Sequence, residues 1–227
     1  MKKCVILTGA GISADSGLQT FRDAGGLWEG HKIEDVATPE AFARNPQQVL
    51  DFYNQRRRQA AAAEPNAAHR ALVRLEAYYR VQIITQNVDN LHERAGSSRV
   101  LHLHGELNKV RSSMDENDII DWEGDQTCAD VDKNGYPMRP HIVWFGESVP
   151  LFEQAAAYVG DADVVMVVGT SLQVYPAASL LQFAPPHADK YLVDPYPGAM
   201  AADVMVVAKK AKEGVPSLVE DLIGLAG

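Results

Sequence analysis

Polar side chains suited to proton transfer follow two short apolar runs of this sequence. The β-branched run Val81–Thr85 leads into Asn87 and Asp89, and the run Val100–Leu103 leads into His104. Their length and composition predict that both runs are strands. Because parallel α/β sheets place their working residues at the carboxyl ends of strands, we expect these side chains to face a common crevice.

The residue types alone leave more than one role open for this cluster. In a strand, His102 and His104 point to the same face, where they could be structural, could bind a metal as a His-x-His pair, or could move protons. A metal site would need ligands after other strands. An imidazole, with a pKa of about 6.5, suits a general base at neutral pH. Asp89 could bind a ligand or merely cap the helix expected from Asn90.

A second motif follows the strand expected at Cys4–Leu7. Gly9, Gly11 and Ala14 match a loose G-x-G-x-x-A dinucleotide fingerprint, in which glycines let the backbone approach a pyrophosphate. A plain dehydrogenase would continue with a helix, a second strand and an acidic residue about 20 residues on. Here the chain passes through the glycine-rich stretch 16–30, which favours a mobile cofactor loop over a hydride-transfer half-domain.

The rest of the chain alternates predicted strands with predicted helices. Further strands are expected at Val164–Val168, Tyr191–Val193 and Val204–Val207, and an extended segment at His141–Phe145. Helices are expected after Thr38-Pro39 and Asn45-Pro46, and over Ala67–Tyr79, His92–Gly96, Leu151–Gly160, Tyr175–Ala184 and Pro216–Leu225. This alternation predicts a parallel sheet covered on both faces. The stretch Glu106–Pro140 is expected to be a small, loop-rich insert.

The composition excludes some classes of function. The net charge of −9 leaves no basic stripe for phosphates, so we expect no nucleic-acid partner. No apolar run is long enough for a membrane span, and we expect no targeting segment. The two cysteines, Cys4 and Cys128, do not form a disulfide framework, which predicts a reducing, cytoplasmic environment.

Four blocks of the sequence, in order, resemble the sirtuin family of NAD-dependent protein-lysine deacylases. They are GAGISADSGLQTFRD from Gly9, TQNVDNLH from Thr85 with HLHGEL from His102, HIVWFGE from His141, and VVGTSLQVYPAA from Val167. The resemblance extends from Leu7 to about Asp194. It implies a Rossmann-like α/β NAD-binding domain and a small domain formed by two insertions. Their expected ranges are 1–30, 71–106 and 142–227 for the large domain, and 31–70 and 107–141 for the small one.

The resemblance also implies roles for the matching residues. The implied catalytic residues are His104, as the general base toward the cofactor ribose, with Asn87 and Asp89 in the nicotinamide pocket. The other implied NAD-binding residues are Gly9, Ala10, Gly11, Ile12, Asp15, Phe21, Arg22, Gln86, Gly169, Thr170, Ser171, Val174, Asp194 and Tyr196. Val143, Phe145 and Gly146 are implied to bind an acyl-lysine substrate, whose backbone would add to this segment as a strand. On its residues alone, the same segment could be a core strand with Trp144 and Phe145 buried.

One residue pair points to a subclass of the family. Tyr53 and Arg56 lie three apart, hence on one face of a helix, and match the pair that marks class III sirtuins, which prefer acidic acyl groups. The resemblance therefore implies removal of succinyl or malonyl groups, with some deacetylation. Without it, the pair could be surface residues beside Arg57 and Arg58.

The sequence departs from the family at the usual zinc site. That site needs two pairs of cysteines, and the insert holds only Cys128. We therefore expect no zinc, and expect the insert to be held by the packing of Trp122, Ile119, Ile120, Tyr136 and Met138.

Two other functions remain open on the sequence. An NAD-binding oxidoreductase is disfavoured because the second strand and its acidic residue are missing. A nucleotide-sensing module without catalysis is disfavoured because His104, Asn87 and Asp89 form a complete set. The expected partners are acyl-lysine proteins.

Overall fold

The computed structural model describes residues 1–19, 30–170, 177–198 and 201–226. Its centre is a six-stranded sheet in the order β3-β2-β1-β7-β8-β9, in which all neighbouring strands are parallel. The strands are β1 (Lys3–Thr8), β2 (Arg80–Thr85), β3 (Val100–His102), β7 (Val164–Val168), β8 (Asp189–Val193) and β9 (Val204–Val207). The predicted parallel sheet is confirmed.

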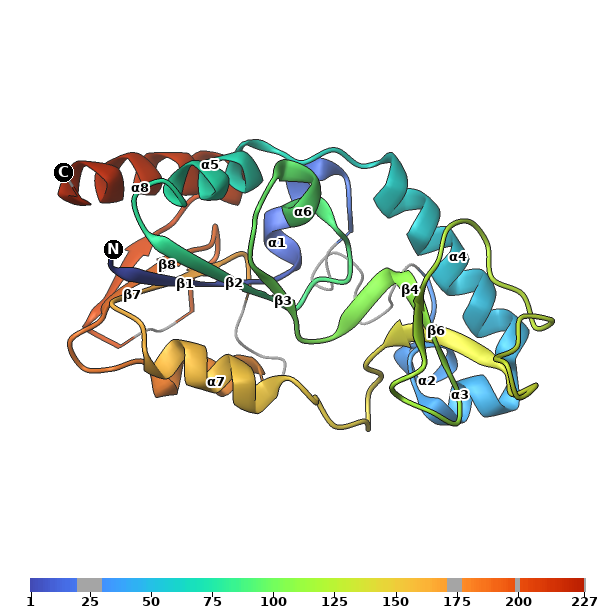
Figure 1. The fold of residues 1–227 in the computed structure, drawn as a ribbon. Helices are drawn as coiled ribbons and strands as arrows, with labels where there is room; N and C mark the ends of the chain where they lie inside the picture. The colour runs from blue at the N-terminus through green and yellow to red at the C-terminus, as the bar shows by residue number, and fades with distance from the viewer. Residues whose placement is uncertain (20–29, 171–176, 199–200, 227) are drawn as a thin grey trace.

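Helices cover both faces of this sheet, which is why its inner strands are continuously apolar. They are α5 (Ala67–Leu75) and α8 (Ala211–Ala226) on one face, and α7 (Phe152–Gly160) with a 3-10 helix (Ala177–Phe183) on the other. Figure 1 shows the two layers on opposite sides of the sheet. Side chains of β7 alternate between them: Met166 joins the core with α5 and α8, and Val167 joins the core with α7.

Polar caps followed by prolines start two helices where the sequence predicts them. Thr38 accepts a hydrogen bond from the N–H of Ala41 (3.0 Å) at the start of α3 (Pro39–Arg44). Asn45 caps α4 (Pro46–Ala62) in the same way. Each cap satisfies an N–H group that the first helical turn leaves unpaired.

Three helix predictions were wrong in extent, and the first of these helices, predicted over Ala67–Tyr79, ends at Leu75. The last helix, α8, begins at Ala211 rather than at Pro216, because Ala211 and Val215 are buried and extend the apolar face toward the N-terminus. The helix predicted over Tyr175–Ala184 is a 3-10 helix over Ala177–Phe183, and residues 175 and 176 lie outside the described part of the chain.

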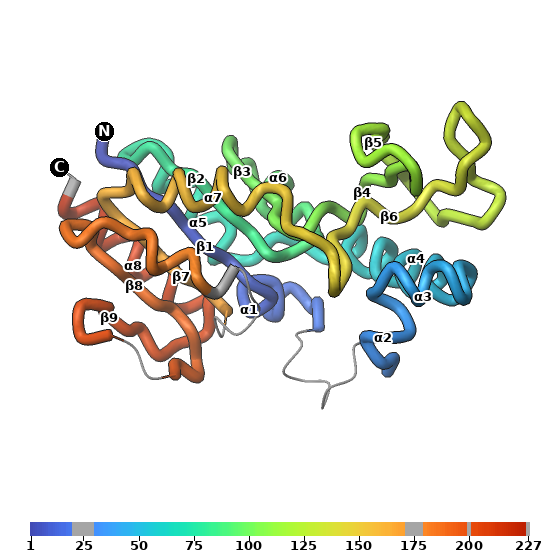
Figure 2. The backbone as a smooth tube through the Cα atoms, turned by 90° about the horizontal axis from the view of Figure 1, so that it is seen from below, coloured from blue at the N-terminus to red at the C-terminus, as the bar shows by residue number. Residues whose placement is uncertain are grey.

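The stretch predicted to be loop-rich instead contributes to a second sheet, of three antiparallel strands in the order β5-β4-β6. The strands are β4 (Gly105–Ser112), β5 (Ile119–Asp121) and β6 (Met138–Ile142), and they lie beside α2 (Ile33–Val36), α3 and α4 (Figures 1 and 2). Polar residues interrupt β4 and its register shifts between Gly105 and Val110, so the alternation that marks a strand is hidden.

The packing predicted for this insert was wrong for three of its five side chains. Ile119, Ile120 and Tyr136 are 40%, 45% and 45% exposed, whereas Met138 is buried. Polar contacts with α4 hold the insert. The Asn54 side chain exchanges two 2.8 Å hydrogen bonds with the backbone of Gln126.

Arg57, three residues after Asn54 on α4, is also buried. The guanidinium of Arg57 donates to the carbonyl oxygens of Leu107 (2.7 Å) and Gly124 (3.1 Å) and to Asn54. The alternative in which Tyr53 and Arg56 are surface residues beside Arg57 and Arg58 therefore does not hold for Arg57. Arg58 does lie at the surface, where it pairs with Asp125.

The structure also bears on the predictions made for the segment His141–Phe145, for the cysteines and for membrane spans. The extended segment predicted over His141–Phe145 is a strand only to Ile142. Of the two side chains that the core-strand alternative would bury, Trp144 is buried and Phe145 is 44% exposed. Cys4 and Cys128 are both free thiols. In the described part of the chain, no helix is both long and apolar enough to cross a membrane. The domain boundaries stay a prediction.

Candidate active site

The strand order reverses between β1 and β7, since the chain first builds β2 and β3 on one side of β1 and then returns to build β7 on the other. Such a switch point opens a crevice at the carboxyl ends of the strands. A cavity of about 560 Å³ lies there, lined by residues that follow β1, β2, β7 and β8 and by residues of α4 and of the segment after β6.

Close packing explains the glycines at the floor of this cavity. The N–H of Gly9 donates to the carbonyl of Val168 (3.0 Å), and the N–H of Gly11 donates to that of Gly169 (2.8 Å). A Cβ on Gly11 would lie 2.6 Å from the Cα of Gly169, closer than any side chain allows. The N–H groups of Gly9 and Gly11 thus already donate hydrogen bonds within the protein. Gly9, Gly11 and Gly169 therefore give a ligand a cavity floor that has no side chains, called the glycine floor below.

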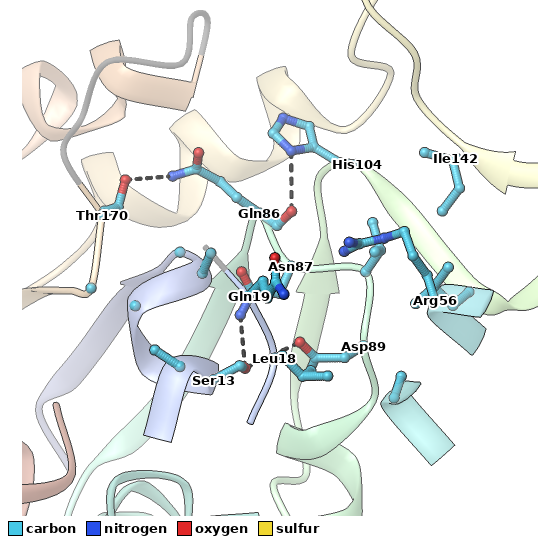
Figure 3. A pocket seen from close by; sticks show the side chains of 18 of the residues that line it. Ser13, Leu18, Gln19, Arg56, Gln86, Asn87, Asp89, His104, Ile142 and Thr170 are labelled. Atoms are coloured by element: carbon cyan, nitrogen blue, oxygen red, sulfur yellow. Dashed lines mark hydrogen bonds between the residues drawn. The ribbon is translucent and has the colours of Figure 1, made fainter. Parts of the chain in front are cut away.

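Three polar side chains that line the cavity form a hydrogen-bonded chain (Figure 3). The amide of Asn87 donates to the hydroxyl of Ser13 (3.1 Å), which donates to Oδ2 of Asp89 (3.1 Å). The other carboxylate oxygen of Asp89 accepts from the N–H of Leu91, the first residue of α6 (Leu91–Ala95). Asp89 therefore does both things that the sequence allowed: it caps a helix and lines the cavity.

Burial controls the ionisation of His104. Its Nδ1 lies 3.1 Å from the backbone carbonyl of Gln86, so Nδ1 carries the hydrogen and Nε2 is left with its lone pair. Burial lowers the pKa of His104 below its ordinary value, although the bond to Gln86 opposes this. A neutral imidazole with an available lone pair is the form that a general base requires. The Gln86 amide in turn donates to Thr170 (3.2 Å).

Aromatic residues line another part of the cavity. Tyr53 is completely buried, and its hydroxyl oxygen accepts a hydrogen bond from Nε1 of Trp144 (3.0 Å). The guanidinium of Arg139 stacks over Trp144 (3.4 Å) and is paired with Glu147 (2.6 Å). Burial raises the pKa of Tyr53, so its phenol stays protonated. Arg56, one turn on, is half-buried and lines the same cavity.

The structure brings most of the predicted site residues together. Those that line the cavity are Gly9, Ala10, Gly11, Asp15, Tyr53, Arg56, Gln86, Asn87, Asp89, His104, Val143, Phe145, Gly146, Gly169, Thr170, Asp194 and Tyr196. Ile12 is not among them, because its side chain is buried in the core under α5 and α8. Phe21, Arg22, Ser171 and Val174 lie outside the described residues. The individual roles stay predictions.

Sequence reasoning missed Ser13, Trp144 and Glu147 as parts of the site. Ser13 stands in a four-residue helix, α1 (Ala10–Ser13), where a serine gives no signal of its own. The importance of Trp144 depends on its contact with Tyr53, far away in the sequence.

The His-x-His metal hypothesis does not fit this geometry. Both ring nitrogens of His102 are engaged by protein acceptors, at 3.0 Å from the carbonyl of Asn87 and at 2.8 Å from Glu93. Among the residues that the structure describes, no group of three or more histidine, cysteine or acidic side chains could hold a metal ion.

Comparisons with known proteins agree on one family. The profile of the Sir2 family matches residues 9–176. An NAD-dependent protein deacylase of Aggregatibacter actinomycetemcomitans is 64% identical and aligns with 86% of this chain and 93% of its own length. One from Helicobacter pylori (strain 26695) is 54% identical over the full length of both.

Solved structures give the same result. A Sir2 homologue in complex with NAD superposes with a TM-score of 0.90 at 39% identity, covering 100% of this chain and 91% of that one. A Sir2 protein in complex with a deacetylated p53 peptide and 3′-O-acetyl-ADP-ribose superposes with a TM-score of 0.83 at 28% identity, covering 96% and 92%.

Proposed function

This chain belongs to the Sir2 family and is an NAD-dependent protein deacylase, and on that premise we propose that it removes acyl groups from lysine side chains of proteins. Its products would be the free lysine, nicotinamide and O-acyl-ADP-ribose. The observation that carries the proposal is the position of His104. Its Nε2 has an available lone pair, and the residue lines the same cavity as the hydrogen-bonded Ser13 and Asp89 and the glycines Gly9, Gly11 and Gly169. We also propose a cytoplasmic location, which the two free thiols support.

The residues present fit NAD. A carboxamide has one acceptor and two donors, and the set Ser13, Asn87 and Asp89 offers hydroxyl, amide and carboxylate groups that complement it. The floor of Gly9, Gly11 and Gly169 has no side chains to block a pyrophosphate. Asp194 and Tyr196 would flank the adenosine end. Bound NAD supplies an electrophilic ribose carbon with nicotinamide as the leaving group.

The protein's own groups then have distinct tasks. The chain of Asn87, Ser13 and Asp89 holds the nicotinamide end of the cofactor, and Nε2 of His104 accepts a proton from a ribose hydroxyl. The segment Val143–Gly146 lies against the cavity and would align the substrate backbone. The N–H groups of Val143 and Phe145 already donate to His104 and Ala37, so we place substrate pairing on the carbonyls of this segment.

We further propose that succinyl- and malonyl-lysine are preferred over acetyl-lysine, which is also accepted. Tyr53 and Arg56 line the cavity from one face of α4. The Tyr53 oxygen already accepts from Trp144, so its proton can be donated to a carboxylate, and Arg56 can grip the same carboxylate with its planar guanidinium. Hydrogen bonds to charged groups contribute roughly 1.5–3 kcal/mol each. At ~1.4 kcal/mol per decade, each of the two contacts would shift selectivity about ten- to a hundredfold.

Detection of O-acyl-ADP-ribose tests the proposed reaction. Purified protein is incubated with NAD and either an acetyl- or a succinyl-lysine peptide, and products are identified by mass spectrometry. A deacylase releases O-acyl-ADP-ribose and nicotinamide together. Formation of NADH would instead indicate an oxidoreductase, and binding of NAD with no product would indicate a sensing module.

Replacement of Arg56 by Met tests the acyl preference. We expect Arg56→Met to lower kcat/KM for the succinyl peptide about tenfold or more and to leave acetyl turnover nearly unchanged, because only the succinyl group presents a carboxylate. Arg58→Met is the matched control, since Arg58 lies half a turn away on α4 and pairs with Asp125 at the surface. A succinyl-to-acetyl ratio that is the same in wild type and Arg56→Met would refute this role.

A further inference from the structure

His102 and His104 hold two consecutive backbone carbonyls. Nδ1 of His102 lies 3.0 Å from the carbonyl oxygen of Asn87, and Nδ1 of His104 lies 3.1 Å from that of Gln86. A carbonyl oxygen only accepts hydrogen bonds, so both Nδ1 atoms must carry a hydrogen. The two imidazoles therefore fix the backbone of the turn that presents Asn87 and Asp89 to the cavity.

The two rings differ at the other nitrogen. Nε2 of His102 lies 2.8 Å from Oε1 of Glu93 on α6, and a carboxylate oxygen is again only an acceptor. A neutral imidazole has a single N–H and can satisfy only one of two acceptors, whereas an imidazolium satisfies both. Within the described residues, no carboxylate is paired with His104, which keeps one nitrogen unprotonated.

We propose that His102 is held as the imidazolium and is a positioning residue that, through the carbonyl of Asn87, fixes the cavity-lining turn beside His104. Its consequence for catalysis rests on the proposed deacylase function. The charge of His102, however, is a property of the protein without any ligand.

The surrounding charges favour this state. The titratable and charged groups around His102 are Glu93 and His92 on α6, Asp89 in the turn, and Glu106 and Lys109 on β4. Burial lowers the pKa of His102, but the hydrogen bond and charge of Glu93, with help from Glu106, more than offset it, so the pKa lies above its ordinary value. Burial lowers the pKa of His104 with no carboxylate to offset it. Neighbouring groups whose pKa values are pushed apart can serve opposite roles in one mechanism.

Activity should therefore require a neutral His104 and a charged His102. We expect a bell-shaped dependence of kcat/KM on pH, with its acidic limb set by His104 and its alkaline limb by His102. On the alkaline side, loss of one proton from His102 removes either its hydrogen bond to Asn87 or its hydrogen bond to Glu93. The ring then no longer links the turn to α6.

Glu93→Gln separates this role from a merely structural one. Removing the carboxylate lowers the pKa of His102, and an opposite charge at this distance is worth about one to three pH units. The alkaline limb should move to lower pH by that amount while the acidic limb stays in place. Glu64→Gln is the matched control, because Glu64 also tethers α6, through Arg94, without contacting a histidine.

Nitrogen-15 NMR of the histidine rings decides the charge without substrate or cofactor. At pH 7 the wild-type protein should show His102 with both ring nitrogens protonated and His104 with only Nδ1 protonated. A neutral His102 at pH 7, or an alkaline limb that is identical in wild type and Glu93→Gln, would overturn the inference. If instead the wild type forms no O-acyl-ADP-ribose, the proposed function fails, and the NMR result still stands as the test of the His102 charge.

Discussion

The part of the cavity lined by Tyr53 and Arg56 shows how neighbouring residues decide which hydrogen bonds one side chain can still make. Trp144 donates to the oxygen of Tyr53, and burial raises the pKa of the phenol, so the hydroxyl is left as a donor. Trp144 is itself fixed between Tyr53 and the stacked guanidinium of Arg139. With Arg56 beside it, this part of the cavity presents hydrogen-bond donors, which suits a carboxylate better than a methyl group.

At the same scale, His104→Ala tests the proposed general base. Loss of a general base typically costs ~10²–10⁴-fold in rate. We expect kcat to fall by that factor while NAD affinity, measured by calorimetry, stays within a few-fold, because His104 lies beside the glycine floor rather than in it. The exposed His187→Ala serves as control. Near-full turnover by His104→Ala would remove this residue from the mechanism.

At the scale of elements, the second sheet is held to α4 by buried polar bonds. Asn54 bonds to the backbone of Gln126 and to the guanidinium of Arg57. We expect Asn54→Ala to destabilise the protein by about 1–3 kcal/mol, because it leaves buried donors and acceptors unpaired. The exposed neighbour Gln55→Ala is the control, and urea unfolding measures both.

Urea unfolding in the presence of a chelator tests the expected absence of structural zinc. If polar bonds to α4 hold the insert, a chelator should leave the unfolding midpoint of the wild type unchanged, and elemental analysis should find no stoichiometric zinc. If the chelator lowers the unfolding midpoint and Asn54→Ala leaves it unchanged, a bound metal rather than these polar bonds stabilises the insert.

How far the sequence predicts these elements depends on whether their signals are local. The inner strands are predictable because runs such as Val164–Val168 are apolar throughout, and the site is predictable where polar residues directly follow them. The second sheet is not, because β4 carries the charged residues Lys109 and Arg111, and the partner of Arg111 comes from another segment. A buried Arg111 needs Glu147, and no local pattern predicts that pairing.

At the scale of the whole molecule, a buried histidine pair should make stability depend on pH. The rings of His69 and His92 lie 4.9 Å apart in the interior. Burial lowers the pKa of His69 from 6.5 to about 4, and it lowers that of His92 as well. Below pH 6.5 the unfolded chain therefore binds protons that the folded protein does not, so stability falls as the pH drops toward 4.

His69→Gln should remove part of this dependence. At ~1.4 kcal/mol per pKa unit, His69 accounts for a loss of about 3 kcal/mol between pH 6.5 and 4. Glutamine can still accept from the N–H of Asn66, as Nδ1 of His69 does. We expect a smaller difference in unfolding free energy between pH 7 and pH 5 in His69→Gln than in wild type or in the exposed His187→Gln. Equal differences in all three proteins would contradict this assignment.

The central place of β1 has a consequence for how the chain folds. Val5 pairs with Gln82 on one side and with Val165 on the other, so β1 has its second partner only after most of the chain has been synthesised. Until then one edge of β1 is open, and such an edge can pair with another chain. Nascent chains that have been synthesised past β2 but not yet through β7 are therefore expected to depend on chaperones. The long loop that must close before β1 pairs with β7 should also make folding slow.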